Sequence, residues 1–148
     1  MRTIKINFDI PKKFEVANTK TLGGVVGLYF IFSEKTYIQY PFKKSRLLYV
    51  GMSEKKTNSM GSRLTSHLEG KNVGLINYRK VSPLYFTYLN YEMLKNVWSL
   101  RIEDLESYFL LDFVKNFGVY PICNNKTGFE VLNNDLAVNF NINWNYFD

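Results

Sequence analysis

The sequence contains only one cysteine, Cys123, and only one histidine, His67, among its 148 residues. A single cysteine cannot form an intramolecular disulfide, which excludes a secreted disulfide scaffold. One cysteine and one histidine are also too few for a Cys/His zinc site. No apolar run approaches the roughly 20 residues that span a bilayer, and residues 1–14 alternate between polar and apolar where a signal peptide would be continuously apolar. We therefore expect a cytoplasmic protein with no membrane partner.

Linkers, repeats and low-complexity tracts are also missing. The four prolines and nine glycines are dispersed, and no stretch is rich in Pro, Gly or Ser. Aromatic residues make up 17% of the sequence, far more than a disordered chain carries. The length suits a single core. These features predict one domain over residues 1–148, with a core at about 23–126 and added segments at 1–22 and 127–148.

Acidic residues are scarce in the first half of the chain. Residues 1–80 contain 15 Lys and Arg against 5 Asp and Glu, whereas residues 81–148 contain 4 against 8. A basic surface is typical of proteins that bind a polyanion, because Lys and Arg contacts to phosphates release counterions. A basic protein without such a partner has the same charge, so charge alone leaves both interpretations open.

The apolar pattern predicts a mixed α+β domain. Strands are expected at residues 3–10, 25–32, 47–50 and 84–89, and a further edge strand is expected in the tail from Asn133, where Asn alternates with apolar residues. Helices are expected at residues 59–69, with Ser59 as N-cap and Gly70 as the stop, and at residues 99–117. Strands joined by hairpins imply a small antiparallel central sheet flanked by helices, with extra short strands at the termini.

Five short motifs follow one another along this order of strands and helices. They are Gly27-Leu28-Tyr29, Tyr49-Val50-Gly51, the pair Arg63 and His67, then Glu106, and finally Pro121-Ile122-Cys123-Asn124. In this order they resemble the GIY-YIG endonuclease family over about residues 27–125. The resemblance implies a GIY-YIG nuclease fold and metal-dependent hydrolysis of DNA phosphodiester bonds.

Phosphodiester hydrolysis needs a cation at the phosphate, a carboxylate that holds a metal and a group that deprotonates water. Arg63 suits the first role, because its fork of donors matches two phosphate oxygens. His67 lies one helical turn later on the same face, where it can orient a proton donor or accept a proton. The hydroxyls of Tyr29 and Tyr49 can face the same cleft. The resemblance implies that one tyrosine acts as, or orients, the general base, and which one is left open.

Glu106 is the expected ligand of Mg²⁺ or Mn²⁺, because these hard ions take oxygen ligands. Glu103, one turn earlier, is the alternative. Asn124 is expected to fix the last turn or to contact phosphate, and Asn125 is its alternative by one position. Cys123, which directly precedes Asn124, is interpreted as a small core residue.

Four lysines are expected to contact DNA. Lys43 and Lys44 lie in the long connection between the two tripeptides, which is also rich in tyrosine, and Lys55 and Lys56 follow the second tripeptide. Basic groups interleaved with aromatic groups in this connection suit DNA backbone and bases, and an ordinary hairpin without DNA contact is the alternative. Symmetric cutting of both strands requires two active sites, and therefore either a homodimer or sequential nicking.

Two alternatives to an endonuclease remain at this stage. One is a non-catalytic nucleic-acid-binding module of the same fold, and the other is a small-molecule or protein-binding domain whose motif matches are accidental. Metal-dependent cleavage separates the enzyme from the binding module, and salt-dependent DNA affinity separates both from the third. Restriction, repair, mobile-element propagation and phage DNA degradation all suit the enzyme.

Overall fold

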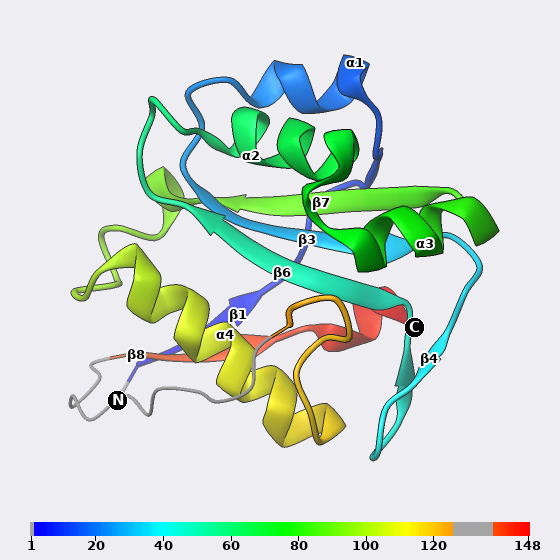
Figure 1. The fold of residues 1–148 in the computed structure, drawn as a ribbon. Helices are drawn as coiled ribbons and strands as arrows, with labels where there is room; N and C mark the ends of the chain where they lie inside the picture. Colours follow the sequence, from blue (N-terminus) through cyan, green and yellow to red (C-terminus); the bar gives the residue numbers. More distant parts are fainter. Residues whose placement is uncertain (1, 126–137) are drawn as a thin grey trace.

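The computed structural model describes residues 2–125 and 138–148. At its centre is a four-stranded antiparallel sheet in the order β2-β7-β3-β6 (Figure 1). The strands are β2 (Lys12–Lys13), β3 (Gly27–Ser33), β6 (Leu47–Ser53) and β7 (Leu84–Asn90). The predicted α+β class and the antiparallel central sheet are therefore confirmed.

Strand β3 pairs with β7 on one edge and with β6 on the other, and both of its faces are covered. All seven of its residues are buried, and they alternate between two apolar clusters, as the period of a strand requires. Tyr29 and Ile31 pack with Met60 and Leu64 on one face, whereas Leu28, Phe30 and Phe32 pack with Phe109 on the other. Figure 1 shows the helices on these two sides.

On the first face lie α1 (Val16–Thr19), the 3-10 turn η1 (Lys20–Leu22), α2 (Met60–Ser66), the irregular helical turn η2 (His67–Lys71) and α3 (Val73–Val81). On the second face lies α4 (Ile102–Phe117), preceded by the 3-10 turn η3 (Tyr91–Met93). None of the helices within residues 2–125 and 138–148 is long and apolar enough to cross a membrane.

The two chain ends pair with each other beside α4. Strands β1 (Arg2–Ile6) and β8 (Val138–Ile142) form a parallel two-stranded sheet, which is followed by the 3-10 turn η4 (Trp144–Phe147). Trp144 and Phe147 pack in the same apolar cluster as Phe30. The terminal segments therefore contribute directly to the larger of the two apolar clusters.

Two predicted strands differ from those observed at the termini. The first ends at Ile6 instead of residue 10, because the chain then turns Phe8 onto Phe30, with ring centroids 4.7 Å apart. The tail strand lies in the sheet with β1 and not at the edge of the central sheet. Its predicted beginning at Asn133, like the predicted boundary near residue 126, lies outside the described residues.

The helix boundaries also differ from those predicted. Regular α2 ends at Ser66 rather than at 69, but helical dihedrals continue through His67, and Gly70 interrupts the turn with φ of 108°. Helix α3 was not predicted. Leu75 is its one buried residue, so no apolar stripe marks the helix in the sequence. Its start depends on Asn72, whose side chain accepts a hydrogen bond from Leu75 N.

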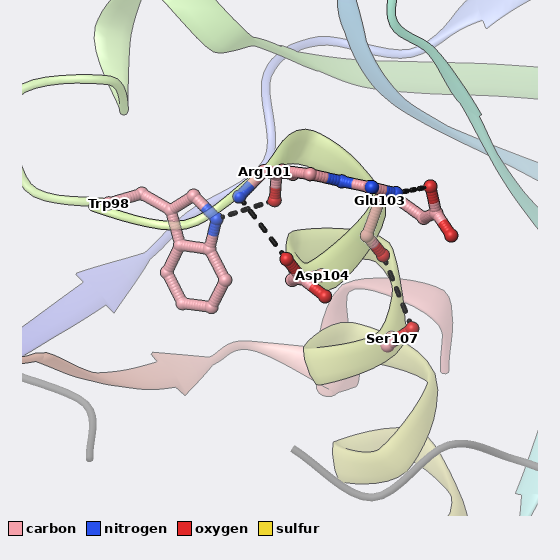
Figure 2. A network of polar contacts seen from close by, with 5 residues as sticks. All are labelled: Trp98, Arg101, Glu103, Asp104 and Ser107. Atoms are coloured by element: carbon pink, nitrogen blue, oxygen red, sulfur yellow. Dashed lines mark hydrogen bonds and ion pairs between the residues drawn. The ribbon is translucent and has the colours of Figure 1, made fainter. Parts of the chain in front are cut away.

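Helix α4 begins at Ile102, three residues later than predicted. Asp104 accepts a hydrogen bond from the backbone N–H of Arg101, and the Trp98 indole donates to the Arg101 carbonyl (Figure 2). These bonds hold Arg101 in an extended conformation at the N-cap. Gly118, with φ of 97°, ends the helix as predicted.

The long connection between β3 and β6 forms a separate hairpin. Its strands are β4 (Ile38–Gln39) and β5 (Lys44–Ser45), which pair only with each other. Figure 1 shows this hairpin extending away from the central sheet at the lower right.

Candidate active site

The two tripeptides meet because β3 pairs with β6. Tyr29 lies opposite Gly51 and is fully buried. A Cβ atom on Gly51 would lie 2.4 Å from Tyr29 Cζ and 2.5 Å from its hydroxyl oxygen. The glycine of the second tripeptide therefore provides the space into which the tyrosine of the first one fits.

We expect Gly51→Ala to reduce the free energy of unfolding by about 1–3 kcal/mol, because the added methyl group overpacks the Tyr29 ring. Gly23→Ala is the matched control, since its Cβ would lie 3.6 Å from the Lys20 carbonyl oxygen, an ordinary contact. Urea denaturation measures both variants. Equal stability of the two would contradict the tight contact at Gly51.

Tyr29, Tyr49 and His67 form one aromatic cluster on the α2 face of the sheet. The Tyr29 hydroxyl oxygen lies 3.0 Å from His67 Nε2, within hydrogen-bond distance. The Tyr49 ring is 6.0 Å from the Tyr29 ring and 4.9 Å from the imidazole, between centroids. His67 and Tyr29 are buried, whereas Tyr49 is partly buried. The structure thus brings together three residues that the sequence placed on three separate elements.

Arg63 extends this cluster from the preceding turn of α2. Burial lowers the pKa of Arg63, but its interactions with Tyr29, then Tyr49 and Glu106, outweigh burial and raise the pKa overall. Burial raises the pKa of Tyr29, although Arg63 opposes that effect. Burial likewise raises the pKa of Tyr49. Both phenols are therefore neutral at pH 7, and Arg63 is charged beside them.

The protonation of His67 follows from its surroundings. Burial, with smaller contributions from the charges of Arg63 and Lys71, lowers the pKa of His67 from 6.5 to about 4. The imidazole is therefore neutral at pH 7. Because Arg63 has only donors, we assign the Tyr29 hydroxyl proton to the bond with His67 Nε2, which leaves the imidazole proton on Nδ1.

Two buried nitrogen atoms at this cluster have no hydrogen-bond partner within the described parts of the chain. They are Arg63 Nε and His67 Nδ1. A buried N–H without an acceptor costs about 1–3 kcal/mol, so native proteins rarely retain one without a reason. In the protonation state assigned above, both atoms are donors. Each of them can therefore donate to an oxygen acceptor.

Glu106 lies on α4, which packs against β6, and it acts electrostatically on the same cluster. Its negative charge raises the pKa of Tyr29, Tyr49 and Arg63. The alternative, Glu103, forms an ion pair with Arg101 at the exposed start of α4 (Figure 2). The charge of Glu106 therefore acts on the tyrosines, whereas Glu103 pairs with Arg101.

The donor set suits a hard metal ion only in part. No group of three or more His, Cys, Asp or Glu side chains occurs among residues 2–125 and 138–148. Mg²⁺ and Mn²⁺ often bind through one or two carboxylates, with water and substrate phosphate completing the shell. A single carboxylate such as Glu106 fits that pattern, in which substrate phosphate completes the coordination shell.

Asn124 has a structural role at β6. Its Oδ1 accepts a hydrogen bond of 2.9 Å from Val50 N, and its Nδ2 donates one of 2.8 Å to Val50 O. Cys123 is buried beside it and donates its backbone N–H to the Leu48 carbonyl. The segment therefore covers the outer edge of β6 and supports the second tripeptide. Asn125, its alternative by one position, is exposed.

Sequence reasoning missed Asn72. Besides capping α3, this buried residue donates a 2.9 Å hydrogen bond from Nδ2 to the Cys123 carbonyl. It therefore connects the helices of the first face to the segment that supports β6. The only local signal is an asparagine before a short apolar stretch, which is typical of many N-caps.

The four predicted DNA-contacting lysines are not gathered in one place. Lys43 and Lys44 lie in the β4–β5 hairpin, before β6 begins, whereas Lys55 and Lys56 lie in the loop that follows β6. All four are exposed. They therefore occupy opposite ends of β6, and the aromatic cluster lies between the two pairs along the strand.

We expect His67 to remain neutral down to about pH 4. An unfolded histidine takes up its proton near pH 6.5, so acidification from 6.5 to 4 favours the unfolded state by up to about 3 kcal/mol. Because His67 is the only histidine, its imidazole signal in proton NMR reports this pKa directly. His67→Gln is expected to remove the loss of stability between pH 5 and 6.5. An NMR pKa near 6.5 would contradict the burial of the neutral ring.

Comparison with protein-family models, curated proteins and solved structures finds no significant match to this chain. The functional assignment therefore depends on the residues of the site.

Proposed function

We propose that this protein is a metal-dependent DNA endonuclease of the GIY-YIG type. One observation carries the proposal, which is that four groups from separate elements interact near the edge strand β6. The Tyr29 phenol of β3 is within hydrogen-bond distance of the His67 imidazole of η2. The Arg63 guanidinium of α2 and the Glu106 carboxylate of α4 act on the same phenol. Phosphodiester hydrolysis requires a fixed cation, a proton acceptor and a ligand for a divalent metal, and these groups match the three requirements.

Arg63 is the cation in this proposal. It remains charged at every relevant pH, and its Nε–H has no acceptor within the described residues. A phosphate oxygen would supply that acceptor through a charge-assisted hydrogen bond. Because negative charge accumulates on the phosphoryl oxygens during the reaction, this interaction strengthens in the transition state and accelerates the chemical step.

Tyr29 and His67 form the proton-accepting pair. An attacking water gives a proton to the Tyr29 oxygen as the hydroxyl passes its own proton to His67 Nε2, over the existing 3.0 Å contact. The water oxygen forms a bond to phosphorus, and the bond from phosphorus to the leaving oxygen breaks. A neutral imidazole is essential for this transfer, and the low pKa of His67 ensures it at neutral pH.

Tyr49 is the positioning residue of the pair. Its ring lies against both Tyr29 and His67 and limits their rotation. Glu106 would hold Mg²⁺ or Mn²⁺, and the bound ion supplies charge stabilisation at the phosphate. The hydrogen bond to His67 favours Tyr29 over Tyr49 as the general base.

The direct test is incubation of supercoiled plasmid with the purified protein. We expect conversion to nicked or linear plasmid with Mg²⁺ or Mn²⁺ and none with EDTA. Tyr49→Phe keeps the stacked ring and should retain most of the rate, whereas Tyr29→Phe removes the proton-transferring hydroxyl and should not. Plasmid that is bound in a gel-shift assay but not cleaved would instead support a nucleic-acid-binding module. The absence of both binding and cleavage would contradict both functions.

A further inference from the structure

The β4–β5 hairpin carries aromatic and basic groups that the sheet does not need. Tyr37 is 47% exposed and Phe42 is 69% exposed, although large apolar side chains usually avoid such exposure in groups. Lys43 and Lys44 are exposed beside them. The hairpin therefore presents rings and positive charge together at the surface.

The two ammonium groups are held by rings and not by carboxylates. Lys44 Nζ lies 5.0 Å from the Tyr37 ring centroid, and Lys43 Nζ lies 4.7 Å from that of Phe117. The ion pairs found within the described parts of the chain involve other residues. A cation–π contact fixes an ammonium group without cancelling its charge, so both charges remain available to an anion.

An open hollow of about 310 Å³ lies beside these groups. Tyr37, Lys43, Lys44 and Asp148 line it. The two ammonium groups of this lining are the groups that can bind phosphate. Its aromatic wall also suits the sugar and base faces of a nucleic acid.

The hairpin leads directly into the strand of the candidate active site. Lys44 lies in β5, and Tyr49 lies five residues later in β6. Five residues span at most about 17 Å when fully extended, which corresponds to no more than roughly five nucleotide steps at about 3.4 Å each along one strand. A single DNA segment is long enough to contact both places.

We propose that the β4–β5 hairpin is a second DNA-binding site, at which Lys43 and Lys44 bind the phosphodiester backbone on one side of the cleaved bond. This inference rests on the proposed function, because it takes DNA as the substrate. It assigns the contact to one end of β6, and it predicts that the hairpin sets affinity while the aromatic cluster sets the chemical rate.

The test measures DNA binding without cleavage. A fluorescent 20-base-pair duplex and its single strand are titrated with the full chain in EDTA at several salt concentrations, and anisotropy is followed. The double variant K43E/K44E should weaken duplex binding at least about tenfold and reduce the slope of log affinity against log salt by about 2, the value for two phosphate contacts. K43R/K44R keeps both charges and should bind like the wild type.

The matched control is K12E/K13E. These two lysines are also adjacent, but they lie in β2, at the edge of the sheet opposite β6. This variant should change the affinity by only a few-fold. Equal losses in both double variants, or no loss in K43E/K44E, would overturn the inference, as would a wild-type chain that binds no DNA. Melting temperatures identify any variant that fails to fold, and K43Q/K44Q then replaces K43E/K44E.

The binding measurement separates this inference from the proposed function. Hairpin-dependent binding by a chain that never cleaves plasmid would support the hairpin site and contradict the nuclease. Cleavage with an unchanged rate and affinity in K43E/K44E would support the nuclease and contradict the hairpin site. Tighter binding of the single strand than of the duplex would assign the occupant to unpaired DNA.

Discussion

Arg63→Ala is expected to lower the single-turnover cleavage rate by about 100-fold or more, the effect of removing one preorganised charge donor. The guanidinium is part of the Tyr29 cluster, and its Nε–H lacks an acceptor within the described residues. DNA affinity in EDTA should change much less, because the interaction strengthens only as charge develops on the phosphate. Arg63→Lys should restore little of the rate, since an ammonium group cannot form the bidentate contact.

The matched control for this prediction is Arg79→Ala. Arg79 lies in the last turn of α3 and is exposed, so its removal should leave the rate nearly unchanged. The two variants are compared in single-turnover reactions, with melting temperatures measured alongside. A folded Arg63→Ala protein that cleaves within a few-fold of the wild type would contradict the proposed role of Arg63.

Glu106→Gln is expected to abolish metal-dependent cleavage while leaving DNA affinity in EDTA nearly intact. The carboxylate acts only through the ion it holds, and without the ion it repels phosphate. Glu103→Gln is the matched control, because it makes the same change three residues earlier on α4, where the side chain pairs with Arg101 at the surface. Plasmid cleavage across a Mg²⁺ titration measures both variants.

Three outcomes of the Glu106 experiment are informative. Loss of cleavage in Glu106→Gln alone supports the proposed metal ligand. Loss in Glu103→Gln alone would show that the ion binds at the start of α4, where Glu103 pairs with Arg101. Full cleavage by both variants would remove the metal assignment from α4 altogether.

The sequence by itself determined those features that depend on neighbouring residues. The apolar runs predicted β3, β6 and β7, because strands whose two faces are wholly or partly covered carry apolar residues at successive positions. A spacing of four on a helix placed Arg63 and His67 on one face. Gly118 marked the end of α4, because the residue after the last turn adopts a left-handed backbone conformation that favours glycine.

Terminal pairing could not be predicted from local patterns. β1 and β8 are separated by more than 130 residues in the chain, and their parallel register depends on the shared core around Phe30. The alternation in each segment indicates a strand, but it carries no information about its partner. Helix α3 was likewise hidden, because tertiary packing of Leu75 stabilises it more than its own pattern does.

Only the tertiary structure decided the chemistry of the site. Its central hydrogen bond joins residues 38 positions apart, Tyr29 and His67, and its formation requires Gly51 to leave space for the phenol ring. The choice of Glu106 over Glu103 depends on which carboxylate acts on the tyrosines and which pairs with Arg101. The physical reason is that protonation and ligand binding respond to burial and to charges nearby in space, whereas a sequence motif specifies only residue types and their spacing.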